Sequence, residues 1–406
     1  MGKILILTPQ IPYPPRQGTA LRNWGILRGL AAHHDVSLLT FAAPDQDTKV
    51  PAVLSDIVER VAVLPQPVRT MKDRLRDLLI DPRPDLLLRL ESQAFRAQLR
   101  AWLAAYPFDW VQAEGLELTG YLDEVWRRPN SPRVIFDDHN CEYLLQQRAC
   151  RSDLRHPSRW MGAAYSAVQW RRLRHHEADI CRRADLAITV SQADASALRS
   201  IVPGFDPLVI PNGISVADYV NFDARESLNQ PALVFTGTMD FRPNVDGVLW
   251  FVHKVWPSIQ DLLPDAHFYI VGRHPHQRLE SLRTMPGIVI TGSVPDTRPY
   301  INAAAVYVVP LLVGGGTRLK ILESTAMGKA VVSTTLGAEG FSDAENVLIL
   351  ADDASAFAEA CIRQAQDTTV GEGLADQGPR SERARRFAEA YDWDVLLPVL
   401  LERLKD

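Results

Sequence analysis

A glycine-rich loop between an apolar strand and a helix points most directly to a ligand. The loop consists of Gly314, Gly315, Gly316 and Thr317. Glycines let backbone N–H groups approach an anion closely, and a helix N-terminus carries roughly half a positive charge. Arg318 and Lys320 add two cations in the first turn, where cations destabilise a helix. A bound diphosphate accounts for this arrangement; the alternative is a glycine-rich turn with two solvated cations.

Glu323 lies one turn further along the same predicted helix. Leu319, Leu322 and Ala326 form the apolar stripe of this helix. Glu323 falls on that stripe, four residues after Leu319. A carboxylate on a buried stripe costs free energy unless a partner bonds to it, and ribose hydroxyls are suitable partners. The alternative is an ion pair with Lys320, three residues back, which contributes only about 0.2–0.5 kcal/mol.

His139 follows the predicted strand Val134–Phe136. Its side chain is therefore expected beyond the carboxyl end of a strand, where doubly wound sheets bind their ligands. The alternative is a histidine whose ring is bonded within its own loop. Pairs of aspartates with one intervening residue occur at 45 and 47 and at 392 and 394, in a polar loop and in the C-terminal segment. We interpret both pairs as surface or capping groups, so no metal site is predicted.

Short apolar strands alternate with amphipathic helices along the whole chain. This alternation predicts parallel sheets that are covered by helices on both faces. The fold class expected is α/β, with two Rossmann-like, doubly wound parallel-sheet domains facing a central cleft. The strands are expected at Lys3–Thr8, Val36–Phe41, Trp110–Ala113, Val134–Phe136 and Leu186–Val190, and then at Leu233–Thr236, His267–Gly272, Ile288–Thr291, Ala305–Pro310 and Ala330–Ser333.

The domain junction is expected where Pro211 and Gly213 follow a strand end. The first domain would then cover residues 1–209 and the second residues 210–387. Residues 388–406 are amphipathic, and we expect them to form a C-terminal helix that packs back on the first domain.

Composition excludes several classes of protein. Apolar residues make up 46% and charged residues 23% of the 406, which is ordinary globular usage. The net charge of −5 argues against a nucleic-acid partner. The four cysteines form no Cys-x-x-Cys pair, which favours a reducing compartment over a disulfide framework. The longest apolar stretch, 303–313, is far shorter than the ~20 residues of a spanning helix. With no signal peptide recognised at the N-terminus, a cytoplasmic protein is expected.

Two stretches of the first half are rich in arginine. They are residues 69–100 and residues 148–183, and the second also carries Trp160, Met161, Tyr165 and Trp170. Basic faces with aromatic edges can lie on anionic lipid, which would place the protein peripherally on the inner face of the plasma membrane. The alternative is a solvated helix face whose arginine stems cover apolar surface.

Taken in order, several stretches give the chain a resemblance to the retaining glycosyltransferases of family 4, which have the GT-B architecture of two Rossmann-like domains. The resemblance covers nearly the whole chain. It rests on residues 11–18, 136–140, 184–191, 209–213, 235–237 and 292–294 and on the loop and helix 314–328.

The resemblance implies that the second domain binds a nucleotide sugar, with UDP or GDP as the nucleotide, and that the first domain binds a glycan or lipid-linked acceptor. Glu323 matches the second glutamate of the family's E-x7-E signature, which holds the ribose. Position 315 should carry the first glutamate of that signature, and this chain has Gly315 instead. Matching positions imply roles at the diphosphate for Arg318, Lys320, Gly314, Gly316 and Thr317, in the donor site for Gly237 and at the base for Val294. Gly18 would lie near the phosphates and the acceptor, and His139 beside the transferred sugar.

The sequence therefore predicts a metal-independent retaining glycosyltransferase of surface polysaccharide or glycolipid synthesis. Catalytic roles are assigned to His139, Arg318 and Lys320, which would stabilise charge on the leaving phosphate and hold the sugar. Two alternatives remain open. One is a nucleotide-sugar epimerase on the same frame, and the other is a catalytically idle sugar-nucleotide-binding or scaffold protein, which Gly315 motivates.

Overall fold

The structure is a computed structural model that describes residues 1–15, 18–43, 46–154, 160–313, 318–341, 343–370 and 378–405. The loop residues Gly314, Gly315, Gly316 and Thr317 lie outside this description. The chain divides into two compact units, one made of Met1–Pro211 with Leu397–Asp406, and the other of Asn212–Leu396.

The first unit contains a seven-stranded parallel sheet in the order β3-β2-β1-β4-β5-β6-β7. The order reverses between β1 and β4, and such a reversal opens a ligand crevice at the carboxyl ends of the strands. The strands are β1 (Lys3–Thr8), β2 (Asp35–Ala42), β3 (Arg60–Pro65), β4 (Trp110–Glu114), β5 (Arg133–Asp138), β6 (Leu186–Thr189) and β7 (Leu208–Val209).

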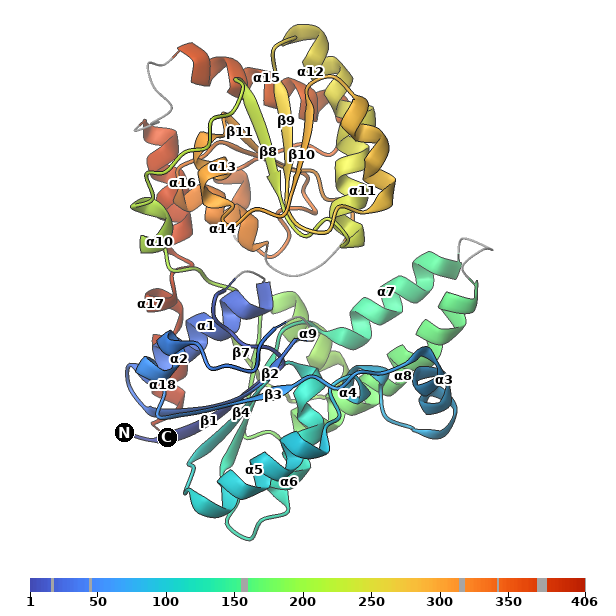
Figure 1. Cartoon of the computed structure of the whole chain (residues 1–406), viewed down its shortest axis with the longest axis vertical. Coiled ribbons are helices and arrows are strands. Elements are labelled where there is room, and N and C mark those ends of the chain that lie inside the picture. The colour runs from blue at the N-terminus through green and yellow to red at the C-terminus, as the bar shows by residue number, and fades with distance from the viewer. Residues whose placement is uncertain are drawn as a thin grey trace. The chain divides into compact units, whose positions relative to one another are not determined.

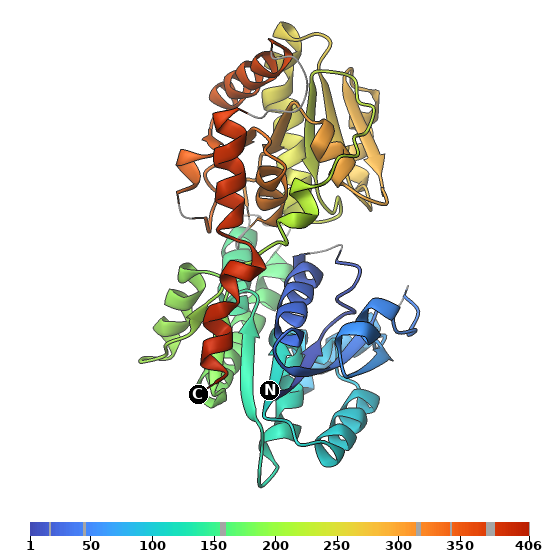
Figure 2. The same cartoon turned by 90° about the vertical axis from the view of Figure 1, so that its left-hand side faces the viewer.

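Helices cover both faces of this sheet (Figure 1; Figure 2), because its strands are apolar on both sides and must be buried on both. The helices are α1 (Gly18–Ala31), α2 (Ala52–Ile57), α3 (Met71–Ile80), α4 (Asp85–Leu88), α5 (Gln93–Ala105), α6 (Leu122–Trp126), α7 (Glu142–Leu154), α8 (Trp160–Arg183), α9 (Gln192–Ile201) and α18 (Pro398–Arg403), with a 3-10 helix at Leu116–Tyr121. Helices α7 and α8 lie side by side and extend together away from the sheet of this unit (Figure 1).

The second unit contains a six-stranded parallel sheet in the order β10-β9-β8-β11-β12-β13. Its order reverses between β8 and β11. The strands are β8 (Ala232–Thr236), β9 (His267–Val271), β10 (Ile288–Gly292), β11 (Val306–Val309), β12 (Val331–Ser333) and β13 (Ile349–Leu350). The helices are α10 (Ala217–Val220), α11 (Arg242–Trp250), α12 (Trp256–Leu262), α13 (Arg298–Ala303), α14 (Leu319–Ala326), α15 (Ala354–Val370), α16 (Pro379–Glu389) and α17 (Trp393–Leu396), with a π-turn at Phe251–Val255 and 3-10 turns at Gln277–Thr284 and Ala344–Asn346.

These two parallel-sheet units confirm the predicted α/β class with two Rossmann-like domains. The C-terminal segment differs from the single helix expected over 388–406, because it is divided among the end of α16 and the short helices α17 and α18. Asp392 interrupts it by pairing with Ile214 and by accepting a hydrogen bond from the N–H of Val216 at 2.8 Å. The part that belongs to the first unit begins at Leu397, whose side chain lies against Gly29 of α1.

Candidate functional site

Lys320, in the first turn of α14, reaches the carboxyl end of β8. Its Nζ donates to the carbonyl of Thr236 at 2.7 Å and to Oδ1 of Asn244 at 3.2 Å. The ammonium also lies 3.9 Å from the centre of the Phe235 ring. Burial and the neighbouring Arg318 lower the pKa of Lys320 to about 7. The amine is therefore held in a position where an anionic ligand would favour its charged form.

Gly237 follows β8 directly and lies beside this amine. A Cβ at this position would be 2.7 Å from Nδ2 of Asn244 and 3.1 Å from Nζ of Lys320. The position of the amine therefore depends on the absence of a side chain at 237. The structure brings together Gly237 and Lys320, both of which the sequence analysis singled out.

Glu323 lies one helical turn after Lys320 and is half-buried. Its Oε1 accepts a hydrogen bond from the hydroxyl of Tyr219 at 3.1 Å. Burial raises the pKa of Glu323 above its ordinary value, while the Tyr219 hydroxyl and the Lys320 charge oppose that rise. The alternative of a Lys320–Glu323 ion pair is wrong, because the hydrogen bonds of each residue go to other groups.

Arg318 and Val294 complete the described part of the predicted ligand site in the second unit. Arg318 precedes α14 at its N-cap position, and burial lowers the pKa of its guanidinium. Val294 follows β10 and packs, half-buried, against the core of this unit. The predicted contacts of Gly314 to Thr317 with a diphosphate fall on residues outside those described.

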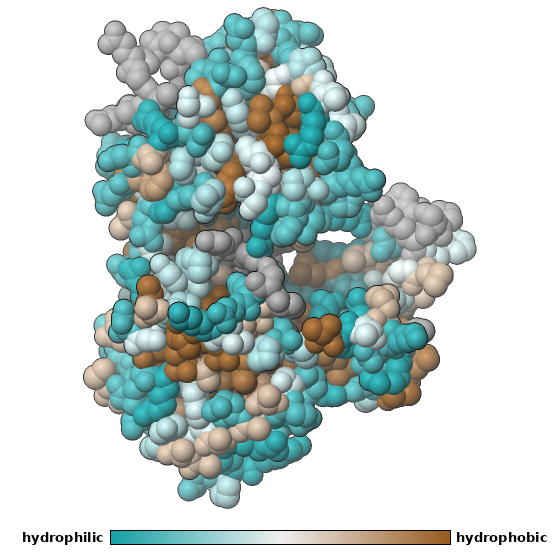
Figure 3. Space-filling model, in the orientation of Figure 1, coloured by the Kyte–Doolittle hydropathy of each residue, from teal (hydrophilic) through white to brown (hydrophobic). Residues whose placement is uncertain are grey.

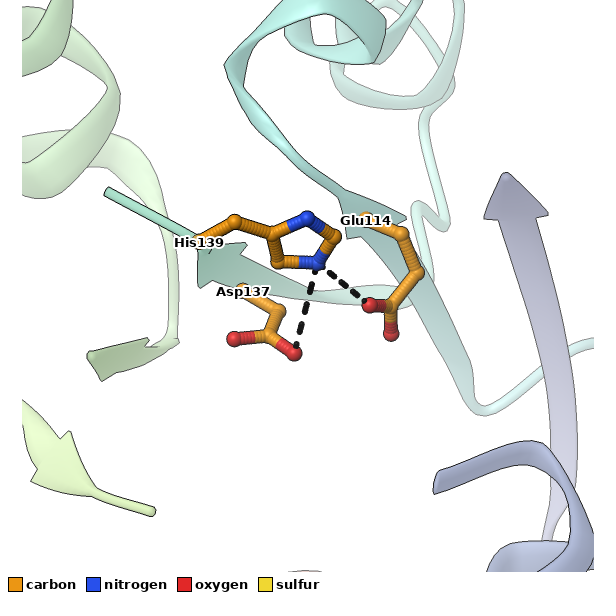
Figure 4. A group of neighbouring side chains, drawn as sticks. All are labelled: Glu114, Asp137 and His139. Carbon is orange, nitrogen blue, oxygen red and sulfur yellow. Dashed lines mark hydrogen bonds and ion pairs between the residues drawn. The ribbon is translucent and has the colours of Figure 1, made fainter. Parts of the chain in front are cut away.

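A second polar cluster lies at the carboxyl ends of β4 and β5 in the first unit (Figure 4). Nε2 of His139 lies 2.9 Å from Oε2 of Glu114 and 3.9 Å from Oδ2 of Asp137. Both carboxyl groups are fully buried, and the imidazole is 12% exposed. The predicted alternative, a histidine bonded within its own loop, is wrong because its partner comes from another strand.

A buried guanidinium balances part of this negative charge. Arg22 on α1 donates from Nε and Nη2 to the two carboxylate oxygens of Asp137, at 2.9 and 2.7 Å. Its Nη1 donates to the carbonyl of Ile210 at 3.0 Å. Gly18 begins the same helix one turn earlier and is exposed.

The donor atoms of Glu114, Asp137 and His139 lie within 4.8 Å of one another, a spacing at which side chains can hold a metal ion. Both oxygens of Asp137 are already bonded to Arg22, whose positive charge would also oppose a cation. We therefore assign no metal to this cluster.

Sequence reasoning missed Arg22, Glu114, Asn244 and Tyr219. Glu114 carried a usable signal, because it is a charged residue at the carboxyl end of the apolar run Trp110–Ala113. Tyr219 and Asn244 carried none, because their partners are more than 70 residues away in the chain.

Two parallel-sheet units of this kind are the architecture of the GT-B fold. Residues 17–218 match the family model described as Glycosyltransferase Family 4, and residues 230–367 match that of Glycosyl transferases group 1. The chain belongs to glycosyltransferase family 4, and it is a glycosyltransferase.

Two relatives show what the chain is similar to at the level of sequence. The chain is 22% identical over 381 residues to an uncharacterized 44.6 kDa protein in the cps region of Klebsiella pneumoniae, covering 90% of this chain and 92% of that protein. It is 29% identical over 202 residues to a phosphatidyl-myo-inositol mannosyltransferase of Mycolicibacterium smegmatis, covering 48% of this chain and 50% of that enzyme.

Solved structures share the fold. Sucrose-phosphate synthase from Thermosynechococcus elongatus superposes with a TM-score of 0.67 at 16% identity, covering 100% of this chain and 98% of that one. Anabaena HepE in complex with UDP-glucose gives a TM-score of 0.62 at 16% identity, covering 100% of both chains.

Within the described ranges, no helix is long and apolar enough to cross a membrane.

Proposed function

We propose that the chain transfers a sugar from a nucleotide-diphosphate sugar, with UDP or GDP as the nucleotide, to a glycan or lipid-linked acceptor. The observation that carries this proposal is the pair Lys320 and Glu323. The two side chains project from adjacent turns of α14 and do not pair with each other. One supplies a cation for a diphosphate, and the other supplies oxygens for ribose hydroxyls. HepE in complex with UDP-glucose and an E. coli structure bound with UDP-2-fluoro glucose share the fold, which supports this donor class.

The roles of the remaining residues follow from charge. Departure of the nucleoside diphosphate builds negative charge, which Lys320, Arg318 and the N-terminus of α14 would stabilise without a metal. The bond from the anomeric carbon to the diphosphate breaks with its electron pair, and the acceptor oxygen bonds to that carbon on the same face. The acceptor proton leaves with the diphosphate. Val294 and Gly237 would border the nucleotide, together with Gly314, Gly315, Gly316 and Thr317.

The acceptor is proposed to bind the first unit, near Gly18 and His139. A lipid-linked or polysaccharide acceptor is supported by the names of relatives, since the mycobacterial relative is called a phosphatidyl-myo-inositol mannosyltransferase. We place the reaction in surface polysaccharide or glycolipid synthesis.

Contact with an anionic membrane is proposed for α7 and α8 rather than for α3. In α3 and the segments on either side of it, Arg69, Arg76 and Arg83 are bonded to carboxylates, so their charge is largely neutralised. On α7 and α8 the apolar residues Leu154, Trp160 and Met161 are 58%, 60% and 90% exposed. The arginines on these helices include Arg148, Arg151, Arg171 and Arg174, all exposed.

Gly315 favours one alternative, an idle binder of sugar nucleotides, because it replaces the first glutamate of the family signature. Such a protein would bind the nucleotide and neither transfer nor hydrolyse the sugar. An epimerase would convert the donor to an isomer without an acceptor.

A thermal-shift screen against UDP, GDP, ADP and TDP tests the donor site. Occupancy at ~100 times the dissociation constant adds about 2.7 kcal/mol of stability. One nucleotide should stabilise the native protein, and Glu323→Ala and Lys320→Ala should abolish the shift. Glu359→Ala and Lys254→Ala, which change exposed residues of the same unit, should retain it. Stabilisation by no nucleotide at millimolar concentration would contradict the proposal.

Incubation of the matching nucleotide sugar with the protein separates the remaining functions. Slow release of free sugar without acceptor supports a transferase, and isomerised donor supports an epimerase. An unchanged donor despite tight binding supports the idle binder.

A further inference from the structure

The imidazole of His139 is held from one edge only. Its Nε2 faces the carboxyl groups of Glu114 and Asp137, while Nδ1 lies on the side of the ring away from both (Figure 4). Among residues that the structure describes, none makes a hydrogen bond to Nδ1. The ring therefore has one anchored nitrogen and one nitrogen that remains for a ligand.

Glu114 is itself fixed by neutral donors. Nε2 of Gln112 donates to its Oε1 at 2.5 Å. In the amide orientation that satisfies both polar atoms of Asn23, the Asn23 nitrogen donates to Oε2 of Glu114 at 2.9 Å and to the carbonyl of Thr19 at 3.1 Å. A buried carboxyl group that receives such donors is strongly restricted in position, and donors of this kind favour its anionic form.

We propose that Glu114 is a positioning residue that binds Nε2 of His139 and thereby makes Nδ1 a hydrogen-bond donor to an oxygen of the substrate. This inference rests on the proposed function only for the identity of the ligand. The position of the His139 ring beside Glu114 is independent of that function.

The proton count makes Nδ1 a donor in two ways. If Glu114 is ionised and His139 is protonated, both ring nitrogens carry hydrogen. If the proton moves to Glu114, its O–H donates to Nε2, and the neutral ring keeps its hydrogen on Nδ1. Nδ1 becomes an acceptor only when the pair loses one proton, after which Nε2–H alone remains. The two groups therefore titrate as a unit.

The surroundings favour the protonated pair. Burial lowers the pKa of His139, but the hydrogen bond to Glu114 and the charge of Asp137 outweigh it, so the pKa is raised overall. Burial and Asp137 raise the pKa of Glu114 to about 7. Arg22 on α1 opposes the protonation of both groups, and Glu142 on α7 also interacts with the ring.

The competing explanation is that the pair only ties β4 to β5. A merely structural hydrogen bond would contribute to stability and would leave the proton on either nitrogen. The two explanations differ in the protonation state of the ring and in its dependence on Glu114, and both can be measured without any substrate.

Nitrogen-15 NMR of the full-length protein labelled in histidine tests the inference. In the native protein, Nδ1 of His139 should stay protonated up to a pH above the ordinary 6.5 of histidine, and above that titration the remaining hydrogen should lie on Nε2. In Glu114→Gln the titration should move down by about one pH unit or more, and Glu114→Asp should restore part of the shift. His176 is the matched control, because it is a histidine of the same unit bonded to Thr119. Burial lowers its pKa to about 4, so its ring should stay neutral across this pH range in all variants.

Two results would overturn the inference. One is a ring with its proton on Nδ1 alone and Nε2 bare above pH 8, and the other is a titration unchanged in Glu114→Gln. If transfer is detected, kcat/KM of the native enzyme should fall with rising pH as Nδ1–H is lost. In Glu114→Gln this fall in kcat/KM should begin at a lower pH. An enzyme without transferase activity would contradict the proposed function and would leave the NMR result to decide the role of Glu114.

Discussion

The proposed donor site depends on two opposite charges of one helix that do not pair with each other. Lys320 and Glu323 are three residues apart on one helix, where opposite charges commonly pair. Here the Lys320 amine donates to Thr236 and Asn244, and the Glu323 carboxylate accepts a hydrogen bond from Tyr219. Each charged group thus keeps part of its surface for a ligand that can replace or extend these bonds.

Lys320 should make donor binding depend on pH. Its pKa of about 7 in the empty site must rise when a diphosphate binds, so binding takes up a proton above pH 7. The affinity for the nucleotide sugar should therefore fall by up to about tenfold per pH unit between pH 7.5 and 9. The diphosphate of a nucleotide sugar is esterified at both ends and does not titrate in this range.

Isothermal titration calorimetry in buffers of different ionisation enthalpy measures the proton uptake. Lys320→Arg, which stays charged throughout, should bind with a flat pH profile, and Lys254→Arg should behave as the native protein. Equal affinity at pH 7.5 and 9 in the native protein would show that the Lys320 amine does not contact the ligand.

At the scale of elements, α1 is tied to the sheet of the first unit through Arg22. Its guanidinium joins Asp137 on β5 to the backbone of Ile210 and Pro211, which follow β7. One side chain therefore connects a helix with two separate strand ends, and it does so where water is excluded.

Replacement of Arg22 by Met should be strongly destabilising. It leaves the Asp137 carboxylate buried without its counter-charge, which typically costs about 3–5 kcal/mol. Urea unfolding should show this loss, whereas Arg28→Met, an exposed change on the same helix, should stay within about 0.5 kcal/mol of the native protein. Adding Asp137→Leu to Arg22→Met should recover part of the loss. An unchanged free energy of unfolding in Arg22→Met would show that the Arg22–Asp137 ion pair does not stabilise the protein.

The α7–α8 pair should bind anionic vesicles through its apolar end. The double change Trp160→Ser and Met161→Ser removes two exposed apolar side chains from α8 and leaves its charges intact. Flotation with vesicles that contain phosphatidylglycerol should show severalfold weaker binding for this variant. Leu262→Ser, which changes an exposed leucine of the second unit, is the control. Equal flotation of native protein and variant would show that Trp160 and Met161 of α8 do not contribute to membrane binding.

At the scale of the whole molecule, the two units have separate sheets and separate cores. Apart from Gly18 and His139, which belong to the first unit, the proposed donor residues belong to the second unit. Donor and acceptor functions are therefore assigned to different units, although both use the carboxyl ends of parallel strands.

Hydrogen exchange should locate the donor on the second unit. The nucleotide alone should slow exchange in Ala232–Thr236 and Leu319–Ala326, because bound phosphates and ribose stabilise these segments. Exchange in Arg133–Asp138 of the first unit should change little. Mass spectrometry of peptic fragments with and without nucleotide measures both. Protection confined to the first unit would contradict the assignment.

Local sequence determined much of this protein. Alternating apolar strands and amphipathic helices predicted both parallel sheets, because burial on both faces demands apolar residues along each strand. The positions of Gly237 after a strand and of Lys320 and Glu323 on a helix were predicted correctly, because helix period and strand ends fix where such residues lie. Their roles in the donor site stay predictions. The extent of the last helix was not predicted, because Asp392 pairs with Ile214 and accepts a hydrogen bond from Val216, which lie in a distant part of the chain.

Only the tertiary structure decided the partners of the charged residues. Arg22 and Asp137 are separated by 115 positions, and Glu114 and His139 come from different strands. No period or spacing relates such residues, because strand order in the sheet, rather than distance along the chain, brings them together. The sequence thus determined which residues carry charge and at which ends of elements they lie. The fold decided which of those charges neutralise each other and which remain for a substrate.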